Sequence, residues 1–117
     1  MTTKIIFYEL SDGSMPVADY LSTLDVKIRA KAAKVINQLA EKGNDLRMPQ
    51  SEFLEDGIFQ LRVHFRNDQI RIMYFFFYND EVILTNAFTK KTRRTPVREI
   101  KAAKVRKADY IRRHRND

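Results

Sequence analysis

Cysteine is absent from this chain, and histidine, glycine and proline are scarce. Of the 117 residues, two are histidine, three are glycine and three are proline. The absence of cysteine excludes a disulfide framework and thiol chemistry, and two histidines alone argue against a zinc site. We therefore expect a function that uses neither a metal nor another cofactor.

Long hydrophobic runs are missing as well. No apolar stretch approaches the ~20 residues that span a bilayer, and the opening MTTKIIFYEL lacks the long apolar core of a signal peptide. Hydrophobic residues still form 44% of the chain, which is enough for a folded core. The sequence therefore predicts one cytoplasmic domain over residues 1–117, without a membrane partner.

Charge is plentiful and unevenly placed, within a formal net charge of +7. Residues 90–117 hold twelve Lys and Arg against three Asp and Glu, a local charge of +9. Residues 1–89 hold ten against twelve, a charge of −2. This excess predicts an anionic partner such as a nucleic acid or an acidic protein segment. A membrane surface fits least, because the basic segment lacks a broad apolar face with aromatic anchors.

Apolar periodicity predicts an α+β domain in the order β-α-α-β-β-β-α. We expect about four antiparallel strands, all helices on one face, and an open second face. A loop is expected over residues 44–56. The predicted strands cover residues 4–10, 58–65, a segment through 73–77 and 82–90, and the helices cover 16–24, 25–43 and a last segment from 95.

Two arginines are expected on the open face of adjoining strands. Apolar and polar residues alternate over 58–65, which places Arg62 and His64 on one side. With a hairpin turn at Asn67-Asp68, His64 would face Arg71 and Arg62 would lie diagonal to it. Such a cationic face suits an extended anion, and a nucleic-acid backbone is the expected one.

The last predicted strand runs directly into a basic segment at the rim of the same sheet. Phe88 could stack on a base, although burial of its ring is equally expected. Four cations follow it and are candidates for backbone contacts, with simple solvation as the alternative for the last two: Lys90, Lys91, Arg93 and Arg94.

Three segments resemble the RelE/ParE toxin superfamily, most closely its HigB-like branch with phage-derived homologues. They are LEDGIFQLRV, RIMYFFF and AFTKKTRRTPVREIKAAKVRKADY, within residues 54–110. The resemblance implies a RelE-like fold and a type II toxin that enters the ribosome and cuts messenger RNA. It also implies a HigA-like helix-turn-helix antitoxin, in a heterotetramer that binds operator DNA through the antitoxin.

The same resemblance assigns residues to the site. Arg62, Arg71 and the Lys90-Lys91 pair match basic active-site positions of RelE-like nucleases. Arg62 and Gln60 stand where relatives often carry lysine, which makes Gln60 a candidate RNA contact. Tyr110 is out of register with the C-terminal catalytic tyrosine of some relatives.

Metal-free RNA cleavage needs a base for the 2′-hydroxyl, stabilisation of the phosphorane and an acid for the 5′-oxygen. Arginine stays protonated, so Arg62 and Arg71 are assigned to the phosphate. Lys90 or Lys91 is a candidate base or acid, with the other lysine holding the phosphate. His64 is a candidate general base, with a solvated strand residue as the alternative. A ParE-like gyrase inhibitor and a non-catalytic nucleic-acid-binding module remain alternatives.

Overall fold

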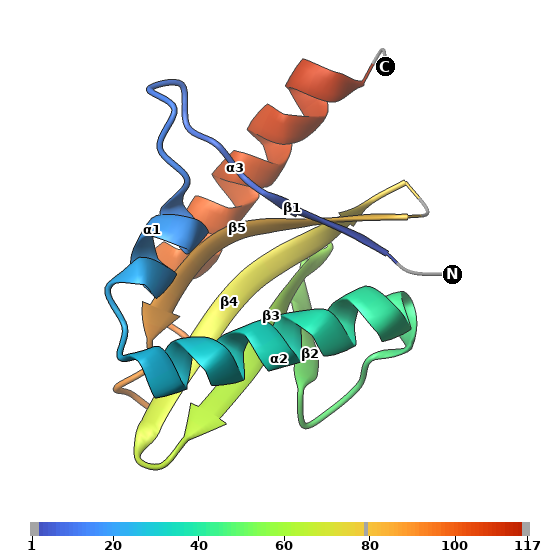
Figure 1. Cartoon of the computed structure of the whole chain (residues 1–117). Helices are drawn as coiled ribbons and strands as arrows, with labels where there is room; N and C mark the ends of the chain where they lie inside the picture. The colour runs from blue at the N-terminus through green and yellow to red at the C-terminus, as the bar shows by residue number, and fades with distance from the viewer. Residues whose placement is uncertain (1–2, 79, 116–117) are drawn as a thin grey trace.

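Five strands form one sheet in the order β1-β5-β4-β3-β2, with helices on both faces (Figure 1). The computed structural model describes residues 3–78 and 80–115, and no helix in these ranges is long and apolar enough to cross a membrane. The elements are β1 (Lys4–Phe7), α1 (Pro16–Ser22), α2 (Val26–Lys42), the 3-10 turn η1 (Gly43–Asp45), β2 (Ser51–Glu55), β3 (Ile58–Phe65), β4 (Asp68–Phe77), β5 (Glu81–Thr89) and α3 (Val97–His114).

Helices α1 and α2 cover one face of the sheet. The Asp25 side chain caps α2 by accepting a hydrogen bond from the Lys27 backbone N–H, as its sequence position predicts. The apolar stripe of α2 is buried against Leu61, Ile72 and Leu84 of the sheet. Burial of this stripe fixes which side of α2 faces solvent.

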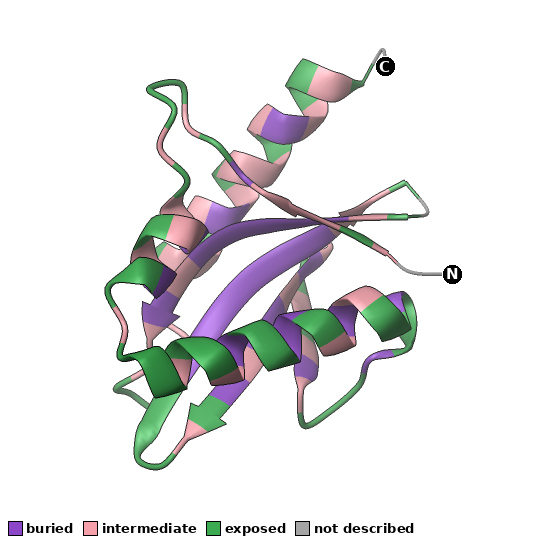
Figure 2. Ribbon diagram, viewed as in Figure 1, coloured by how far each residue is buried: buried purple, intermediate pink, exposed green. Residues whose placement is uncertain are grey.

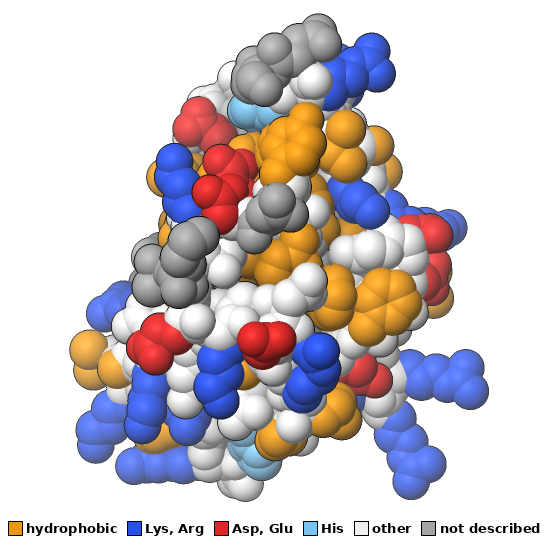
Figure 3. Space-filling model, turned by 90° about the vertical axis from the view of Figure 1, so that its right-hand side faces the viewer, with side chains coloured by type: hydrophobic (Ala, Val, Ile, Leu, Met, Phe, Trp, Pro, Cys, Tyr) orange, Lys and Arg blue, Asp and Glu red, His pale blue; other side chains and the backbone are white. Residues whose placement is uncertain are grey.

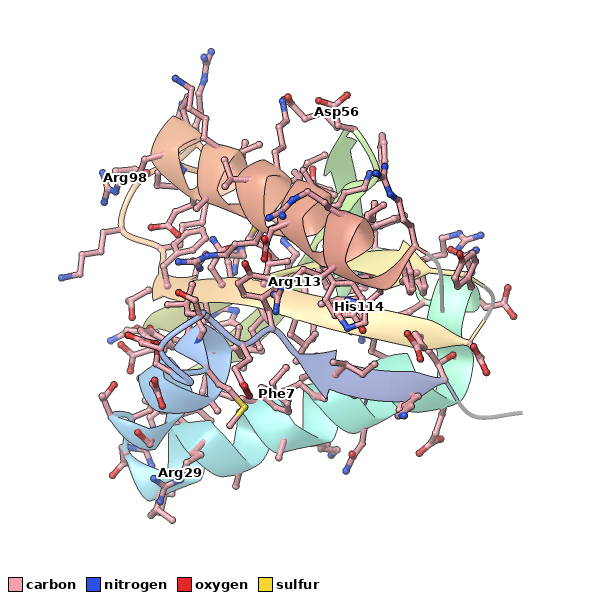
Figure 4. All side chains as sticks on the ribbon, turned by 90° about the horizontal axis from the view of Figure 1, so that it is seen from above. Phe7, Arg29, Asp56, Arg98, Arg113 and His114 are labelled. Carbon is pink, nitrogen blue, oxygen red and sulfur yellow. The ribbon has the colours of Figure 1, made fainter. Side chains whose placement is uncertain are left out.

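Helix α3 packs on the opposite face, so the prediction that all helices share one face is wrong (Figure 4). Ala103 and Tyr110 of α3 pack against Phe75 and Ile83. The reason lies in β4, where apolar residues occur on both sides of the strand. A central strand of this kind needs cover on both faces, and Figure 2 shows β4 and β5 buried along most of their length.

The sheet also contains a strand that the sequence pattern did not predict. Residues 51–55, expected within a loop, form the short charged edge strand β2 antiparallel to β3. Strands β2 to β5 form an antiparallel meander. β1 pairs in parallel with β5 and forms the edge of the sheet opposite β2. β1 is also shorter than predicted, because it ends at Phe7.

The turn between β3 and β4 lies at Arg66-Asn67 rather than at Asn67-Asp68. Arg66 takes a positive φ of 56° there. The register therefore differs by two positions from the expected one, which keeps every side chain on its predicted face. Asn79, expected in the next turn, lies outside the described residues. The pairs near the first turn are Phe65 with Asp68, His64 with Gln69, and Arg62 with Arg71.

Candidate functional site

Two rows of side chains run across β3, β4 and β5 on the face of the sheet that α3 covers, next to the start of α3. The start of α3 is held by Gln60 and Asn86, which bond to Thr95 and Glu99 respectively. The first row lies two residues further along the strands and consists of Arg62, Arg71 and Phe88. The second row contains His64, Gln69 and Lys90, whose backbone N–H donates to the Gln69 carbonyl over 2.7 Å.

Arg71 is the central cation of this region and is only 4% exposed. Its Nη2 donates to Gln69 Oε1 over 3.0 Å and its Nη1 to the Ile70 carbonyl over 3.2 Å. Its Nε has no hydrogen-bond partner. Burial lowers the pKa of Arg71, and the nearby Arg62 lowers it further against the opposing effect of Glu52.

A buried guanidinium needs a counter-ion and satisfied donors to be stable. Within residues 3–78 and 80–115, no carboxylate lies within 4.0 Å of the Arg71 nitrogens. The sequence placed Arg71 on the correct face but predicted it to be exposed, which is wrong. Its burial with an unsatisfied donor marks a place where an anion would be stabilised.

Lys90 is the inward member of the lysine pair. Burial lowers its pKa, as do Arg71 and then Arg62, while Glu52 opposes them. Its Nζ donates to the Arg93 carbonyl over 2.7 Å. Lys91 is exposed at the rim, so the structure distinguishes two residues that the sequence could not.

Arg62 and His64 complete the cationic face next to Arg71. Arg62 is half-buried, and its Nη1 lies 3.6 Å from the sulfur of Met48. His64 is exposed, and its Nε2 lies 2.9 Å from the Arg66 carbonyl. The expectation that His64 faces Arg71 is wrong, because the register pairs it with Gln69 instead.

Gln60 and Phe88 do not lie on the open surface that the sequence predicted for RNA contacts. Gln60 is 3% exposed. Its Nε2 donates to Glu52 Oε1 over 2.8 Å, and its Oε1 accepts from Thr95 over 3.0 Å. Phe88 is buried in the core beneath α3. Both side chains therefore support the site from within the protein.

A hollow of about 380 Å³ opens beside the arginines at the edge of β3. Its lining includes Arg62, His64 and Arg71, together with Lys31 and Lys34 of α2. The sequence alone gave these two lysines no role. Cationic side chains gather over the lower part of the face shown in Figure 3.

The exposed loop after β5 forms a second basic surface. Arg93 and Arg94 are both exposed in it, and a hollow of about 670 Å³ there is lined by Lys90, Lys91 and Arg93. No group of three or more His, Cys, Asp or Glu that could hold a metal ion occurs in the part of the chain that the structure describes. The chemistry available here is that of cations and one exposed imidazole.

Tyr110 lies far from these cations. Its ring centroid is 5.2 Å from that of Phe77 and 5.9 Å from that of Phe75. Phe77 is six positions along β4 from Arg71, or roughly 20 Å at 3.3 Å per residue. Tyr110 is therefore a core residue of α3 outside the candidate site.

A mixed α+β fold with three helices and a five-stranded sheet is consistent with the RelE-like fold. A family model of phage-derived Gp49-like proteins (DUF891) matches residues 19–108. The chain belongs to this family, which is associated with RelE/HigB-like toxins. No curated protein matches the chain significantly. The matched range includes Arg62, Arg71 and Lys90.

Proposed function

We propose that the chain is a HigB-like type II toxin that cuts messenger RNA on the ribosome without a metal ion. The observation that carries this proposal is Arg71, buried with an unsatisfied Nε and without a carboxylate partner among the described residues. Arg62 is close enough to lower the pKa of Arg71, and Arg71 is close enough to lower the pKa of Lys90. Membership of a toxin-associated family supports the same function.

In this proposal the two guanidinium groups of Arg62 and Arg71 bind the scissile phosphate and the extra negative charge of the phosphorane. Neutral Lys90 accepts the proton of the 2′-hydroxyl, whose oxygen then attacks phosphorus. The bond from phosphorus to the 5′-oxygen breaks, and a water molecule supplies a proton to that oxygen, while the proton taken up by Lys90 returns to solvent. The products are a 2′,3′-cyclic phosphate and a free 5′-hydroxyl.

Three features favour Lys90 over Lys91 as the base. Lys90 lies in the row next to the arginines, its pKa is lowered by burial and by both guanidinium groups, and Lys91 is exposed. A lowered pKa increases the fraction of neutral amine near neutral pH. Lys91 is left to contact the RNA backbone.

The direct test is induced expression followed by mapping of messenger RNA 5′ ends. We expect cuts with the natural chain and none with Arg71→Ala or Lys90→Ala, while Arg29→Ala on the outer side of α2 serves as a matched surface control. Unchanged cuts by a folded Arg71→Ala protein would refute the assignment. Gyrase stalling without RNA cuts would favour a ParE-like inhibitor, and RNA binding without cuts would favour a non-catalytic module.

We also propose a HigA-like helix-turn-helix antitoxin as the cognate partner, in a heterotetramer that binds operator DNA through the antitoxin. A small open reading frame next to the gene of this chain should encode it, and its co-expression should restore growth. Light scattering on the purified complex measures the stoichiometry. Toxicity that persists with every neighbouring reading frame co-expressed would contradict this partner.

A further inference from the structure

Lys31 and Lys34 stand on the outer side of α2, next to the hollow described above. They are three positions apart, so they lie on neighbouring turns of the same side of the helix. Lys31 is half-buried and Lys34 is exposed. Neither ammonium group has a carboxylate within 4.0 Å in the described ranges of the chain. Both charges are therefore available to a ligand in the hollow.

The open end of β3 connects these lysines to the arginines on the other face of the sheet. β2 begins at Ser51, opposite Leu61, and the Gln50 carbonyl accepts from the Arg62 backbone N–H over 2.7 Å. β3 continues past this point to Phe65. The hollow therefore reaches around the sheet edge, with α2 cations on one side and Arg71 on the other.

We propose that Lys31 and Lys34 form a second phosphate subsite, which binds the phosphate next to the scissile one as the RNA bends around the end of β3. The inference rests on the proposed function, because it takes RNA as the ligand. A volume of about 380 Å³ lies in the range of sites for nucleotide-sized ligands. Arg71, with its unpartnered buried Nε, also lines this hollow.

The glutamine side chains of the hollow fit an RNA ligand as well. Gln38 and Gln50 line it together with the two groups of cations. An amide carries both donors and acceptors, so it can bond to a ribose hydroxyl or to a base edge. A ligand with several phosphates and polar groups between them can bond to both groups of cations and to the amides. One inorganic phosphate can bond to only one group of cations.

The test compares the double variant Lys31→Gln/Lys34→Gln with the matched double variant Lys27→Gln/Lys42→Gln, which removes the same charge from exposed positions of α2 outside the hollow. The probe is a fluorescent single-stranded RNA of ten 2′-O-methyl nucleotides, which cannot be cut. We expect about tenfold weaker binding for the first pair and a salt slope reduced by about 1.4, from roughly 0.7 per lost contact. The matched pair should bind within about twofold of the natural chain.

A dinucleotide probe with a single phosphodiester separates a second subsite from the first. Its binding should be unaffected by Lys31→Gln/Lys34→Gln and lost in Arg71→Ala. Equal effects of the two double variants on the ten-nucleotide probe would overturn the inference, as would a matching loss with the dinucleotide.

Cutting assays distinguish failure of this inference from failure of the proposed function. Cuts lost in Arg71→Ala, with natural cutting and binding in Lys31→Gln/Lys34→Gln, would reject the subsite and keep the nuclease. Selective loss of binding in Lys31→Gln/Lys34→Gln, without cuts by any form of the protein, would keep the subsite and reject the nuclease.

Discussion

Arg71 is a residue at which stability and the proposed activity oppose each other. Its buried Nε is unsatisfied and its charge lacks a carboxylate partner among the described residues. Replacing buried charged groups with apolar side chains of similar volume is often neutral or stabilising. We expect Arg71→Met to raise the free energy of unfolding by about 1 kcal/mol and Tm by roughly 3–6 °C, while RNA cutting is lost.

Thermal unfolding in a buffer without multivalent anions measures this effect. Added sulfate should stabilise the natural chain more than Arg71→Met, because a ligand that binds only the folded state raises its stability. A lower Tm for Arg71→Met in the absence of anions would show that the guanidinium stabilises the empty protein.

Lys90 gives the proposed activity its pH dependence. Burial, Arg71 and Arg62 all lower its pKa, so the neutral base accumulates at lower pH than for a free lysine. In Arg62→Gln one neighbouring positive charge is gone, which raises the pKa of Lys90. We expect the midpoint of the alkaline rise in single-turnover cutting to move to higher pH in this variant. An unmoved midpoint would exclude Lys90 as the base.

At the residue scale, strand alternation was sufficient to place Arg62, Arg71 and His64 on one face. It could not reveal that Arg71 is buried, because the burial of a strand residue depends on how the rest of the chain packs around it. It also could not decide which of Lys90 and Lys91 lies inward, because the alternation of side chains does not continue beyond the end of a strand. The role proposed above for Lys31 and Lys34 was not predicted, because it depends on where β2 begins along β3.

At the scale of elements, side-chain bonds connect α3 to the N-terminal segment that follows β1. The Tyr8 hydroxyl donates to Asp109 Oδ2 over 2.5 Å, and Arg113 forms an ion pair with the same carboxylate at 2.8 Å. The Tyr8 hydrogen bond is the largest cause of a lowered pKa for Asp109, with Arg113 and Arg112 adding to it. This contact joins the segment after β1 to the middle of the last helix.

A lowered carboxylate pKa contributes stability above the pKa of the unfolded chain, near 3.9. That contribution disappears as the pH falls through the folded value. We expect Asp109→Asn to lower the free energy of unfolding at pH 7 by less than about 1 kcal/mol, since the site is solvent-screened. In urea titrations the difference from the natural chain should shrink as the pH falls below about 3.9 and through the folded pKa of Asp109. A difference that stays constant over this range would rule out the charge as its cause.

The start of α3 depends on a buried amide. Gln60 links Glu52 on β2 to Thr95 before the helix. Gln60→Leu removes both bonds, and we expect it to destabilise the fold by about 1–3 kcal/mol. It should also reduce cutting, because the loop that carries Lys90 loses an anchor. Hydrogen exchange over residues 90–96 measures the loosening, and unchanged exchange there would contradict this role.

Most elements were predictable because their signals are local. The helices predicted over residues 16–24, 25–43 and from 95 lie close to the observed bounds, and alternation predicted β3. β2 was missed because a segment of five residues with two glutamates and a serine is typical of a loop. The face of α3 was mispredicted because the apolar residues on both sides of β4 indicate two covered faces only when the whole sheet is considered.

At the scale of the molecule, the separation of charge predicts a strongly salt-dependent interaction with RNA. Residues 90–117 carry +9 and the rest −2, and several site cations lack carboxylate partners in the described ranges. Three or four phosphate contacts imply a slope of log affinity against log salt of about −2 to −3 for a single strand. Anisotropy titrations between 50 and 300 mM salt test this estimate, and a slope near zero would contradict phosphate recognition.

The parallel pairing of β1 with β5 ties the timing of folding to the direction of synthesis. β1 emerges from the ribosome first, but it cannot pair with β5 until residues 81–84 have been synthesised. The sheet then remains bare on one side until α3 has left the exit tunnel. The fold is therefore complete only after the ribosome has released the chain, so under the proposed function the protein cannot act on a ribosome that is still synthesising it.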